Sequence, residues 1–343
     1  MDGEFELIAR LRSLAEARGA AGAAGGRIVL PSGDDAAVTV PGGATATSVD
    51  AVVEGVHFRL ATMPARSVGH KALAAALSDL AAMAAAPGEA YVIVGVPADL
   101  DEDVLLEVGA GLVDVAAAHG VAIAGGDVTR APALWLGLTV VGHASAPAEL
   151  VSRAGASAGD VLAVTGEIGG AAAGLELLER PALGGALDDA IADSLCARQL
   201  EPQPRLAAGR ALREAGASAM IDVSDGLGAD GGHLAAASGV AAEIEVERLP
   251  IQAGVREVAA VAGLDPVDLA AAGGEDYELL ASIPPARVDD AVAALAAIGV
   301  RLTPVGHLAG GSGVLIRSRD GAVREPSGFD QLRRRPRARS ARA

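Results

Sequence analysis

Six aspartates stand at the ends of expected strands and helices, where folding brings carboxylates together. Asp50 ends an expected strand, Asp79 lies inside an otherwise apolar helix, and Asp127 follows two glycines at another strand end. A single aspartate is usually a solvated charge or a helix cap, and for any one of these residues that interpretation holds. An unpaired buried carboxylate is costly, however, so the apolar surroundings of Asp79 indicate a partner. The set is Asp35, Asp50, Asp79, Asp127, Asp222 and Asp225.

These carboxylates need a metal cation, because the 343-residue chain holds a single lysine to pair with them. Mg²⁺ is the natural choice, since it is a hard ion that prefers oxygen ligands. Zinc is not favoured, because no His-x-x-x-His or His-Glu-x-x-His spacing occurs. Several Mg²⁺ ions in an acidic site suggest phosphoryl transfer from a nucleotide. The alternatives are a structural calcium site, for which no EF-hand loop is present, and a nuclease.

The charge balance argues against the nuclease and against any nucleic-acid partner. The formal net charge is −17, whereas affinity for nucleic acid depends on basic residues that neutralise phosphates. Six arginines lie in the last eleven residues, and we expect residues 332–343 to be a disordered tail.

The single lysine, Lys71, also excludes two common phosphate-binding motifs. It lies in Val-Gly-His-Lys-Ala, which is not the Gly-Lys-Ser/Thr of a P-loop. The protein-kinase signature is missing as well, because the chain has no His-Arg-Asp sequence. We expect Lys71 to lie on a helix surface, although its place on the helix that carries Asp79 is notable.

Strands and helices alternate along the chain, which predicts an α/β (α+β two-domain) fold. The length predicts roughly two domains, at about 150 residues each. We place the boundary in the segment His143–Leu150, which gives domains of 1–146 and 147–331. The longer helices are expected at Phe5–Arg18, Ser67–Ala85, Asp101–His119, Ala171–Glu179, Pro204–Ala215 and Val288–Ile298. The strands that position the carboxylates are expected at Ala44–Val49, Tyr91–Val96, Val121–Ala124, Leu134–Gly142, Ser218–Asp222 and Tyr277–Ile283.

A cytoplasmic location is expected. The longest apolar stretches fall short of the roughly 18 residues that a membrane span requires. The first residues are acidic, where a signal peptide would be basic. Cys196 is the only cysteine, so the chain can form no intramolecular disulfide.

Eight short motifs, in order along the chain, resemble the thiamine-monophosphate kinase family. They extend from residue 3 to about residue 330, and the wider superfamily includes aminoimidazole ribonucleotide synthetase. The Gly-Glu-Phe and Glu-Gly-Val-His-Phe motifs indicate the thiamine branch. The motifs include Gly33-Asp34-Asp35, Glu54-Gly55-Val56-His57-Phe58, Leu77-Ser78-Asp79-Leu80, Gly125-Gly126-Asp127, Ser152-Arg153-Ala154-Gly155, Asp222-Val223-Ser224-Asp225-Gly226 and Gly273-Gly274-Glu275-Asp276-Tyr277.

This resemblance implies a role for each matching residue and no catalytic side chain beyond them. The implied metal ligands are Asp35, Ser48, Asp50, Asp79, Asp127, Asp222 and Asp225. The implied ATP contacts are Gly126, Asp127, Arg153 and Ser224, and the implied thiamine phosphate contacts are His57, Glu275 and Phe329. Two departures stand out. Val49 replaces a frequent threonine and leaves only its main-chain oxygen for ligation, and Phe329 replaces a frequent tyrosine and lacks its hydroxyl.

Several of these residues have an ordinary structural interpretation when taken alone. A lone histidine such as His57 is more often an ordinary core residue, and an arginine such as Arg153 is usually a surface charge. The glycines of Gly166-x-x-Gly169-Gly170 precede a helix, where an anion can bind, but we interpret them as structural support. Trp135 is expected in the core.

The resemblance implies an enzyme that converts thiamine monophosphate and ATP to thiamine diphosphate and ADP with Mg²⁺. The acceptor is already an anionic phosphate, so the reaction needs no general base and proceeds by direct in-line transfer. It further implies a homodimer in which the amino-terminal mixed sheet pairs with that of a second subunit, next to a carboxy-terminal α/β domain. The alternatives are another ATP-dependent enzyme of the superfamily and a non-catalytic nucleotide or Mg²⁺ binding protein.

Overall fold

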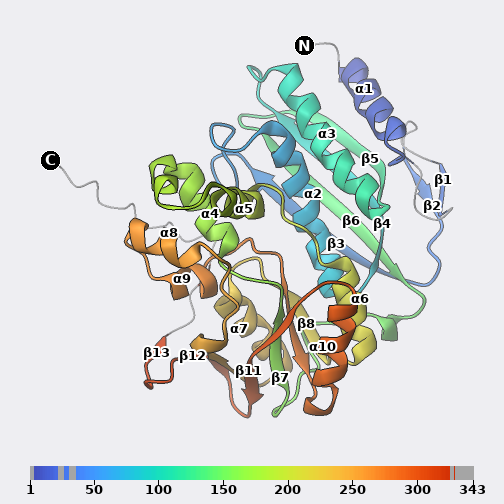
Figure 1. Cartoon of the computed structure of the whole chain (residues 1–343). Coiled ribbons are helices and arrows are strands. Elements are labelled where there is room, and N and C mark those ends of the chain that lie inside the picture. Colours follow the sequence, from blue (N-terminus) through green and yellow to red (C-terminus); the bar gives the residue numbers. More distant parts are fainter. Residues whose placement is uncertain (1–3, 22–26, 31–35, 325–327, 329–343) are drawn as a thin grey trace.

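The computed structural model describes residues 4–21, 27–30, 36–324 and 328, which form two units of sheet and helix (Figure 1). The first unit contains a four-stranded sheet in the order β3-β6-β4-β5, where β4 and β5 are parallel and the other neighbours antiparallel. A separate two-stranded sheet, β1 with β2, precedes it. The strands are β1 (Ile28–Leu30), β2 (Val38–Thr39), β3 (Ala44–Val53), β4 (Ala86–Val96), β5 (Ala122–Arg130) and β6 (Trp135–Ala144).

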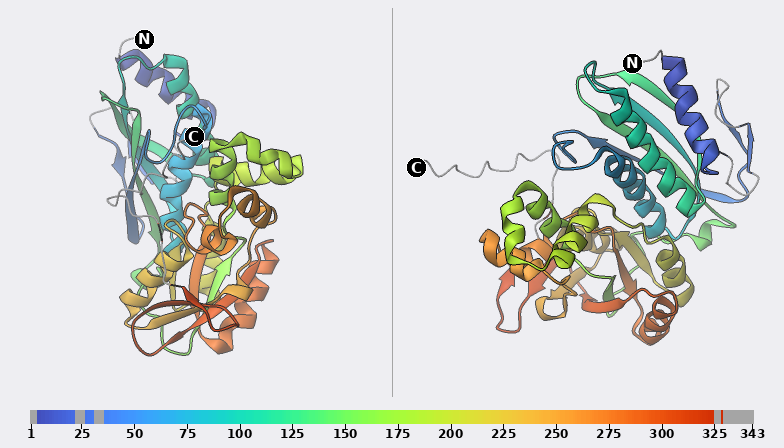
Figure 2. Two further views of the ribbon diagram at one scale, coloured as in Figure 1. Left: turned by 90° about the vertical axis from the view of Figure 1, so that its left-hand side faces the viewer. Right: turned by 45° about the horizontal axis from the view of Figure 1, so that its top comes forward.

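Three helices, α1 (Glu4–Ala17), α2 (Ala65–Ala82) and α3 (Glu102–His119), lie on one side of the four-stranded sheet (Figure 2). α2 and α3 approach to backbone contact, because a Cβ atom at Gly69 would lie 1.8 Å from the carbonyl oxygen of Val108. The opposite face of the sheet bears exposed apolar side chains, among them Val49, which is 74% exposed, and Ile93. β3 therefore has a covered face and an open face, as the alternation of side chains along a strand requires.

The second unit contains a seven-stranded sheet in the order β13-β12-β9-β11-β7-β10-β8. Only the β9 and β12 pair is parallel among the ladders of this sheet that the structure describes. Its strands are β7 (Val161–Thr165), β8 (Ala219–Asp222), β9 (Ala241–Glu245), β10 (Leu279–Ile283), β11 (Leu302–Ala309), β12 (Gly313–Arg317) and β13 (Val323–Arg324).

Helices cover both faces of the second sheet. Leu280 of β10 faces the core beneath α7, whereas its neighbours Leu279 and Ala281 join a core shared with α2, α6 and α10. α2 therefore belongs to a hydrophobic core that runs without a break from one unit into the other. The helices are α4 (Gly170–Glu179), α5 (Asp189–Leu200), α6 (Leu206–Ala215), α7 (Leu227–Ser238), α8 (Val255–Ala262), α9 (Pro266–Ala271) and α10 (Val288–Ala297), with 3-10 turns at Pro147–Glu149, Pro181–Ala186, Val246–Arg248 and Pro285–Arg287.

The expected two-domain α/β architecture is confirmed, with a mixed sheet in each unit. Two local expectations were wrong, and one helix was missed. β4 begins at Ala86 and includes Pro87, where we expected a helix to end and a strand to start at Tyr91. β10 begins at Leu279, because the positive φ of Tyr277 interrupts the extended chain. α5 was not expected at all, although Asp188 caps it by accepting a hydrogen bond from the Ala190 amide. None of the helices within the described ranges is long and apolar enough to cross a membrane.

Candidate functional site

A first group of site residues lies where β3 faces α2. Ser48 and Asp50 project from the covered face of β3, and the Ser48 hydroxyl donates a hydrogen bond to the Asp79 carboxylate on α2. The Asp50 carboxylate accepts a hydrogen bond from the Ala51 amide at 2.7 Å. Burial raises the pKa of Asp50, and the negative charge of Asp79 raises it further. Sheet and helix therefore place two carboxylates close enough to repel each other.

Asp222 brings a third carboxylate to this place from the other unit. It ends β8, is 4% exposed, and has a pKa raised to about 7 by burial and by the charge of Asp79. The positive charge of Arg153 opposes this rise in the pKa. Arg153 lies near Asp222 because the carbonyl of its neighbour Ser152 accepts a hydrogen bond from the Met220 amide of β8. The charge of Asp79 thus raises the pKa of one buried carboxylate in each unit, which is typical of a functional site.

The loop after β8, Ser224–Gly226, is held by a residue that the sequence analysis missed. One carboxylate oxygen of Asp230 accepts hydrogen bonds from the amides of Ser224, Asp225 and Gly226, each at 3.0 Å. Burial and the charges of Asp222 and Asp225 raise the pKa of Asp230 to about 8. The signal in the sequence was the spacing: an aspartate one turn inside a helix can reach back to the amides that precede the helix.

The segment Gly273–Glu278 lies against this loop and is strained. Glu275 and Tyr277 have φ angles of 70° and 50°, which non-glycine residues rarely adopt. Their amides donate hydrogen bonds to the carbonyl oxygens of Ser224 and Val223, so the segment extends the β8–β10 ladder beyond Leu279. Gly274 permits this approach, since a Cβ atom there would lie 2.3 Å from the Ser224 carbonyl oxygen.

Side chains from three directions fasten the same segment. Glu275 forms an ion pair with Lys71 of α2, at 2.7 Å between Nζ and Oε1, and accepts a hydrogen bond from Gln199 of α5 at 2.8 Å. Asp276 accepts hydrogen bonds from the Gly169 and Ala171 amides at the start of α4. The expectation that Lys71 lies on a helix surface was therefore wrong, because Lys71 is 2% exposed.

Glu278 anchors the end of the segment. Its carboxylate receives the Arg205 guanidinium in two hydrogen bonds of 2.6 and 2.8 Å, and also accepts from Arg198 and from the Thr165 hydroxyl. A cleft of about 440 Å³ opens beside these arginines, and Gln252 also lines it. The glycines that precede α4 are structural support, as expected, because the Asp276 carboxylate occupies that helix N-terminus.

His57 lies next to the carboxylates. Its Nδ1 atom accepts a hydrogen bond from the Val53 amide at 3.1 Å, whereas its buried Nε2 atom has no hydrogen-bond partner among the described residues. The imidazole also opposes the rise in the pKa of Asp50, which places it on the same side of β3. Tyr277 is buried in the same surroundings, and its pKa is well above the ordinary value because of burial first and the charge of Glu275 second.

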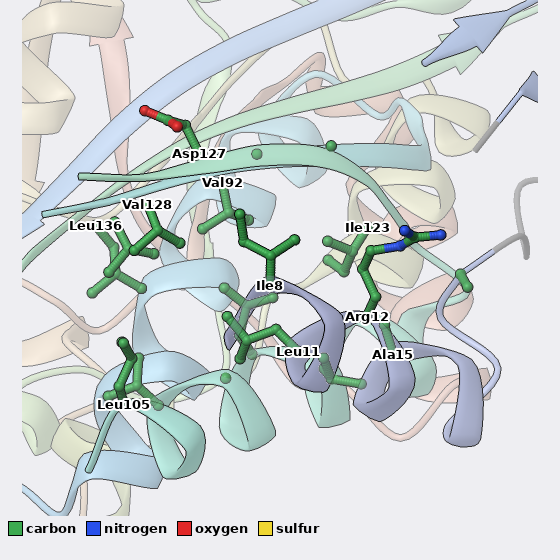
Figure 3. Close-up of a pocket in the computed structure, with 18 of the residues that line it drawn as sticks. Ile8, Leu11, Arg12, Ala15, Val92, Leu105, Ile123, Asp127, Val128 and Leu136 are labelled. Atoms are coloured by element: carbon green, nitrogen blue, oxygen red, sulfur yellow. The ribbon is translucent and has the colours of Figure 1, made fainter. Parts of the chain in front are cut away.

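Asp127 lies apart from these residues within one chain. Its carboxylate points away from the apolar side chains of a cavity of about 180 Å³ between α1, α3 and the sheet, including Ile8 and Val92 (Figure 3). β5 is separated from β3 by three strand spacings, or roughly 14 Å. Gly126 next to it packs against β4, since a Cβ atom there would lie 2.2 Å from the Val92 carbonyl oxygen.

The structure thus gathers most of the predicted site residues, with exceptions. Among residues 4–21, 27–30, 36–324 and 328, no group of three or more His, Cys, Asp or Glu side chains is arranged to hold a metal ion. Asp35 and Phe329 lie outside the described residues, as does the tail 332–343. On one side, the described residues of the site offer carboxylates that repel one another. On the other side lies the segment Gly273–Glu278, called the Glu275 segment below, which is held by contacts from both units. This chemistry suits a divalent cation whose remaining ligands come from a bound anion.

Comparison with known proteins gives two family matches. Residues 33–144 match the model for the N-terminal domain of AIR synthase related proteins, and residues 157–317 match the model for the C-terminal domain. The thiamine-monophosphate kinase of Escherichia coli K12 is 37% identical over 324 residues, which cover 93% of this chain and 94% of that protein.

Solved structures agree with this match. The crystal structure of thiamine-monophosphate kinase from Stenotrophomonas maltophilia K279a superposes with a TM-score of 0.80 at 37% identity, covering 92% of this chain and 96% of that one. The structure described as "AaThiL complexed with AMPPCP and TMP" has a TM-score of 0.74 at 29% identity and covers 95% and 96% of the two chains.

Proposed function

This chain belongs to the thiamine-monophosphate kinase family of the AIR synthase related proteins, and we propose from this membership that it phosphorylates thiamine monophosphate with ATP to give thiamine diphosphate and ADP. One observation carries the proposal: Ser48 of β3 donates a hydrogen bond to Asp79 of α2, and the charge of Asp79 raises the pKa of Asp50 in its own unit and of Asp222 in the other. A related protein was solved with AMPPCP and TMP together, which is consistent with a ternary complex of nucleotide and acceptor.

The chemistry fits direct transfer. A phosphate acceptor is already nucleophilic and anionic, so the enzyme needs to position two polyanions in line rather than remove a proton. The Glu275 segment faces the carboxylates and is fixed by contacts from α2, α4 and α5. We assign thiamine monophosphate to His57, Glu275 and Phe329, and ATP to Gly126, Asp127, Arg153 and Ser224.

Mg²⁺ is the cation that we propose for the acidic side. Burial and the negative charge of Asp79 raise the pKa of both Asp50 and Asp222, and a bound cation would relieve this repulsion. Mg²⁺ commonly takes one or two protein carboxylates and completes its ligands with substrate phosphates and water. When bound, it would neutralise phosphate charge. The proposed ligands are Asp35, Ser48, Asp50, Asp79, Asp127, Asp222 and Asp225, and Val49 contributes at most its main-chain oxygen.

The open face of the first sheet supports a homodimer. Val49 and Ile93 expose apolar side chains on the sheet face opposite the helices, and burial of exposed apolar side chains favours association. We propose that this sheet pairs with that of a second copy. The dimer also gives Asp127 a role, since a carboxylate on the far side of its own sheet is available to the site of the partner.

The remaining expectations form part of the same proposal. We divide the chain into an amino-terminal domain of residues 1–146, a carboxy-terminal domain of residues 147–331, and a tail of residues 332–343. A cytoplasmic location, where ATP and Mg²⁺ are available, stays a prediction.

A coupled assay of ADP release tests the activity. The purified protein is supplied with ATP, Mg²⁺ and either thiamine monophosphate, thiamine, another phosphomonoester or no acceptor, and the product is identified by phosphorus NMR. We expect turnover and a diphosphate product with thiamine monophosphate alone. Turnover with a different phosphomonoester would assign the protein to another reaction of the superfamily, and nucleotide binding without turnover would make it a non-catalytic binding protein.

A further inference from the structure

Lys71 is the only lysine of the chain, and it is buried between the two units. It lies on α2, two helical turns before Asp79. Its ammonium group forms an ion pair with Glu275, at 2.7 Å from Oε1. The pair joins a helix of the first unit to the Gly273–Glu278 segment of the second.

The burial of the ammonium group makes this contact consequential. The Lys71 side chain is 3% exposed and the Glu275 side chain 26% exposed. Removal of one partner from a buried ion pair leaves the other charge without compensation, which costs far more than the loss of an exposed pair. The ammonium group is therefore committed to Glu275 as long as the segment stays in place.

The ion pair with Lys71 helps to hold Glu275 in an unfavourable backbone conformation. A φ angle of 70° is unfavourable for glutamate, so surrounding contacts must hold the residue there. The two carboxylate oxygens are engaged from two helices, Oε1 by Lys71 and Oε2 by the amide of Gln199 at 2.8 Å. Asp276 and Glu278 fasten the segment elsewhere, but of the described residues only Lys71 and Gln199 orient the side chain of Glu275 itself.

We propose that Lys71 is a positioning residue for acceptor binding: its ion pair orients the Glu275 carboxylate toward thiamine monophosphate and fixes the distance between the Glu275 segment and α2. This inference rests on the proposed function. Lys71 acts through Glu275, because its buried ammonium group lies against the Glu275 carboxylate as an ion pair, although Nζ makes no hydrogen bond of good geometry among the described residues.

The test compares Lys71→Met, Glu275→Gln and the double variant with wild type in the ADP-release assay. We expect Lys71→Met to raise the KM for thiamine monophosphate about tenfold or more, because breaking a buried ion pair from one side is strongly unfavourable, with kcat and the KM for ATP within threefold of wild type. The double variant should be no worse than the more impaired single variant. Lys71→Arg should recover part of the loss.

Arg66→Met is the matched control, since Arg66 is also a basic residue of α2 but pairs with Asp114 on an exposed surface. It should leave both KM values unchanged. Multiplicative effects of the two single variants would overturn the proposal and would indicate that Lys71 contacts a phosphate directly. An unchanged KM in Lys71→Met would overturn it as well.

The ADP-release assay distinguishes failure of the proposed function from failure of the positioning role. If the proposed function fails, wild type itself releases no ADP with thiamine monophosphate, and the positioning role toward this acceptor falls with it. A thermal unfolding cycle on wild type, Lys71→Met, Glu275→Gln and the double variant needs no substrate and reports the ion pair alone. Additive changes in melting temperature would show that Lys71 and Glu275 do not interact in solution, which would also overturn the proposal.

Discussion

Asp276 accepts a hydrogen bond from the backbone amide of Gly169 at 2.6 Å, and this bond fastens the Glu275 segment to the first turn of α4. A second bond, from the Ala171 amide at 3.1 Å, completes the attachment. The strained backbone on either side of Asp276 is thus secured at the residue between Glu275 and Tyr277.

Asp276 makes stability depend on pH. Burial raises its pKa to about 6, above the value of an unfolded aspartate. The folded state therefore holds a proton that the unfolded state releases, and this contribution to stability is full below about pH 4 and is lost as pH rises through about 6. Asp276→Asn cannot titrate, so the difference in the free energy of unfolding between wild type and variant should shrink from pH 4.5 to pH 7.5. Urea unfolding in chelator at both pH values measures it, and a constant difference would contradict the assignment.

Asp50→Asn should abolish turnover while leaving the protein folded. The change removes a proposed metal ligand and relieves the repulsion with Asp79, so the melting temperature in chelator should stay the same or rise. The assay at saturating Mg²⁺ checks this, with the exposed Asp99→Asn as the control. A near-normal rate for Asp50→Asn would remove it from the site.

Mg²⁺ should stabilise the folded protein by mass action, and Mg²⁺ with a non-hydrolysable nucleotide should stabilise it further. Sodium chloride at equal ionic strength should stabilise the folded protein less, because screening of the carboxylate charges is weaker than coordination of a cation by them. Asp79→Asn should reduce the increment from Mg²⁺, since it removes the carboxylate that couples to both Asp50 and Asp222. Coincident thermal unfolding curves with and without Mg²⁺ would mean that these aspartates bind no cation.

Glu278→Gln should destabilise the protein by about 3 kcal/mol, the usual cost of breaking a buried ion pair from one side. Glu278 is fully buried and accepts from both Arg198 and Arg205, so the variant leaves Arg205 without its counter-charge and Arg198 with only Asp276, at 4.0 Å. Chemical unfolding measures the loss. Glu179→Gln, which alters the exposed pair with Arg59, should change stability by less than about 1 kcal/mol.

Ile93→Lys should convert the proposed dimer to a monomer, because it places a charge on the open sheet face. Sedimentation velocity gives the oligomeric state directly. If Asp127 serves the site of the partner, the monomer should also lose activity at low protein concentration. A wild-type protein that sediments as a monomer would contradict the dimer and the role given to Asp127 together.

The approach of Asp50, Asp79 and Asp222 was predictable in part, because aspartates that follow an apolar strand or interrupt an apolar helix show in the residue pattern alone, whereas Asp127 lies apart from them. Asp79 in its apolar helix is the clearest case. The roles of Lys71 and Asp230 were not predictable, since each depends on a partner from a distant part of the chain or on a local turn. The residue pattern of the helix predicted a surface position for Lys71, because a local pattern carries no information about the second unit that covers it. The start of β10 was misplaced for a similar reason: the positive φ of Tyr277 is imposed by hydrogen bonds to another strand.

The burial of Lys71 gives this chain an internal reporter of motion. The chain has one lysine, so it carries a single side-chain amine, and that amine is inaccessible while the Glu275 segment rests on α2. An amine-directed acylating reagent would modify Lys71 only in molecules in which the Gly273–Glu278 segment has moved away from α2. The rate of modification at this position, followed by mass spectrometry, would therefore measure how often that segment leaves α2, without any engineered probe.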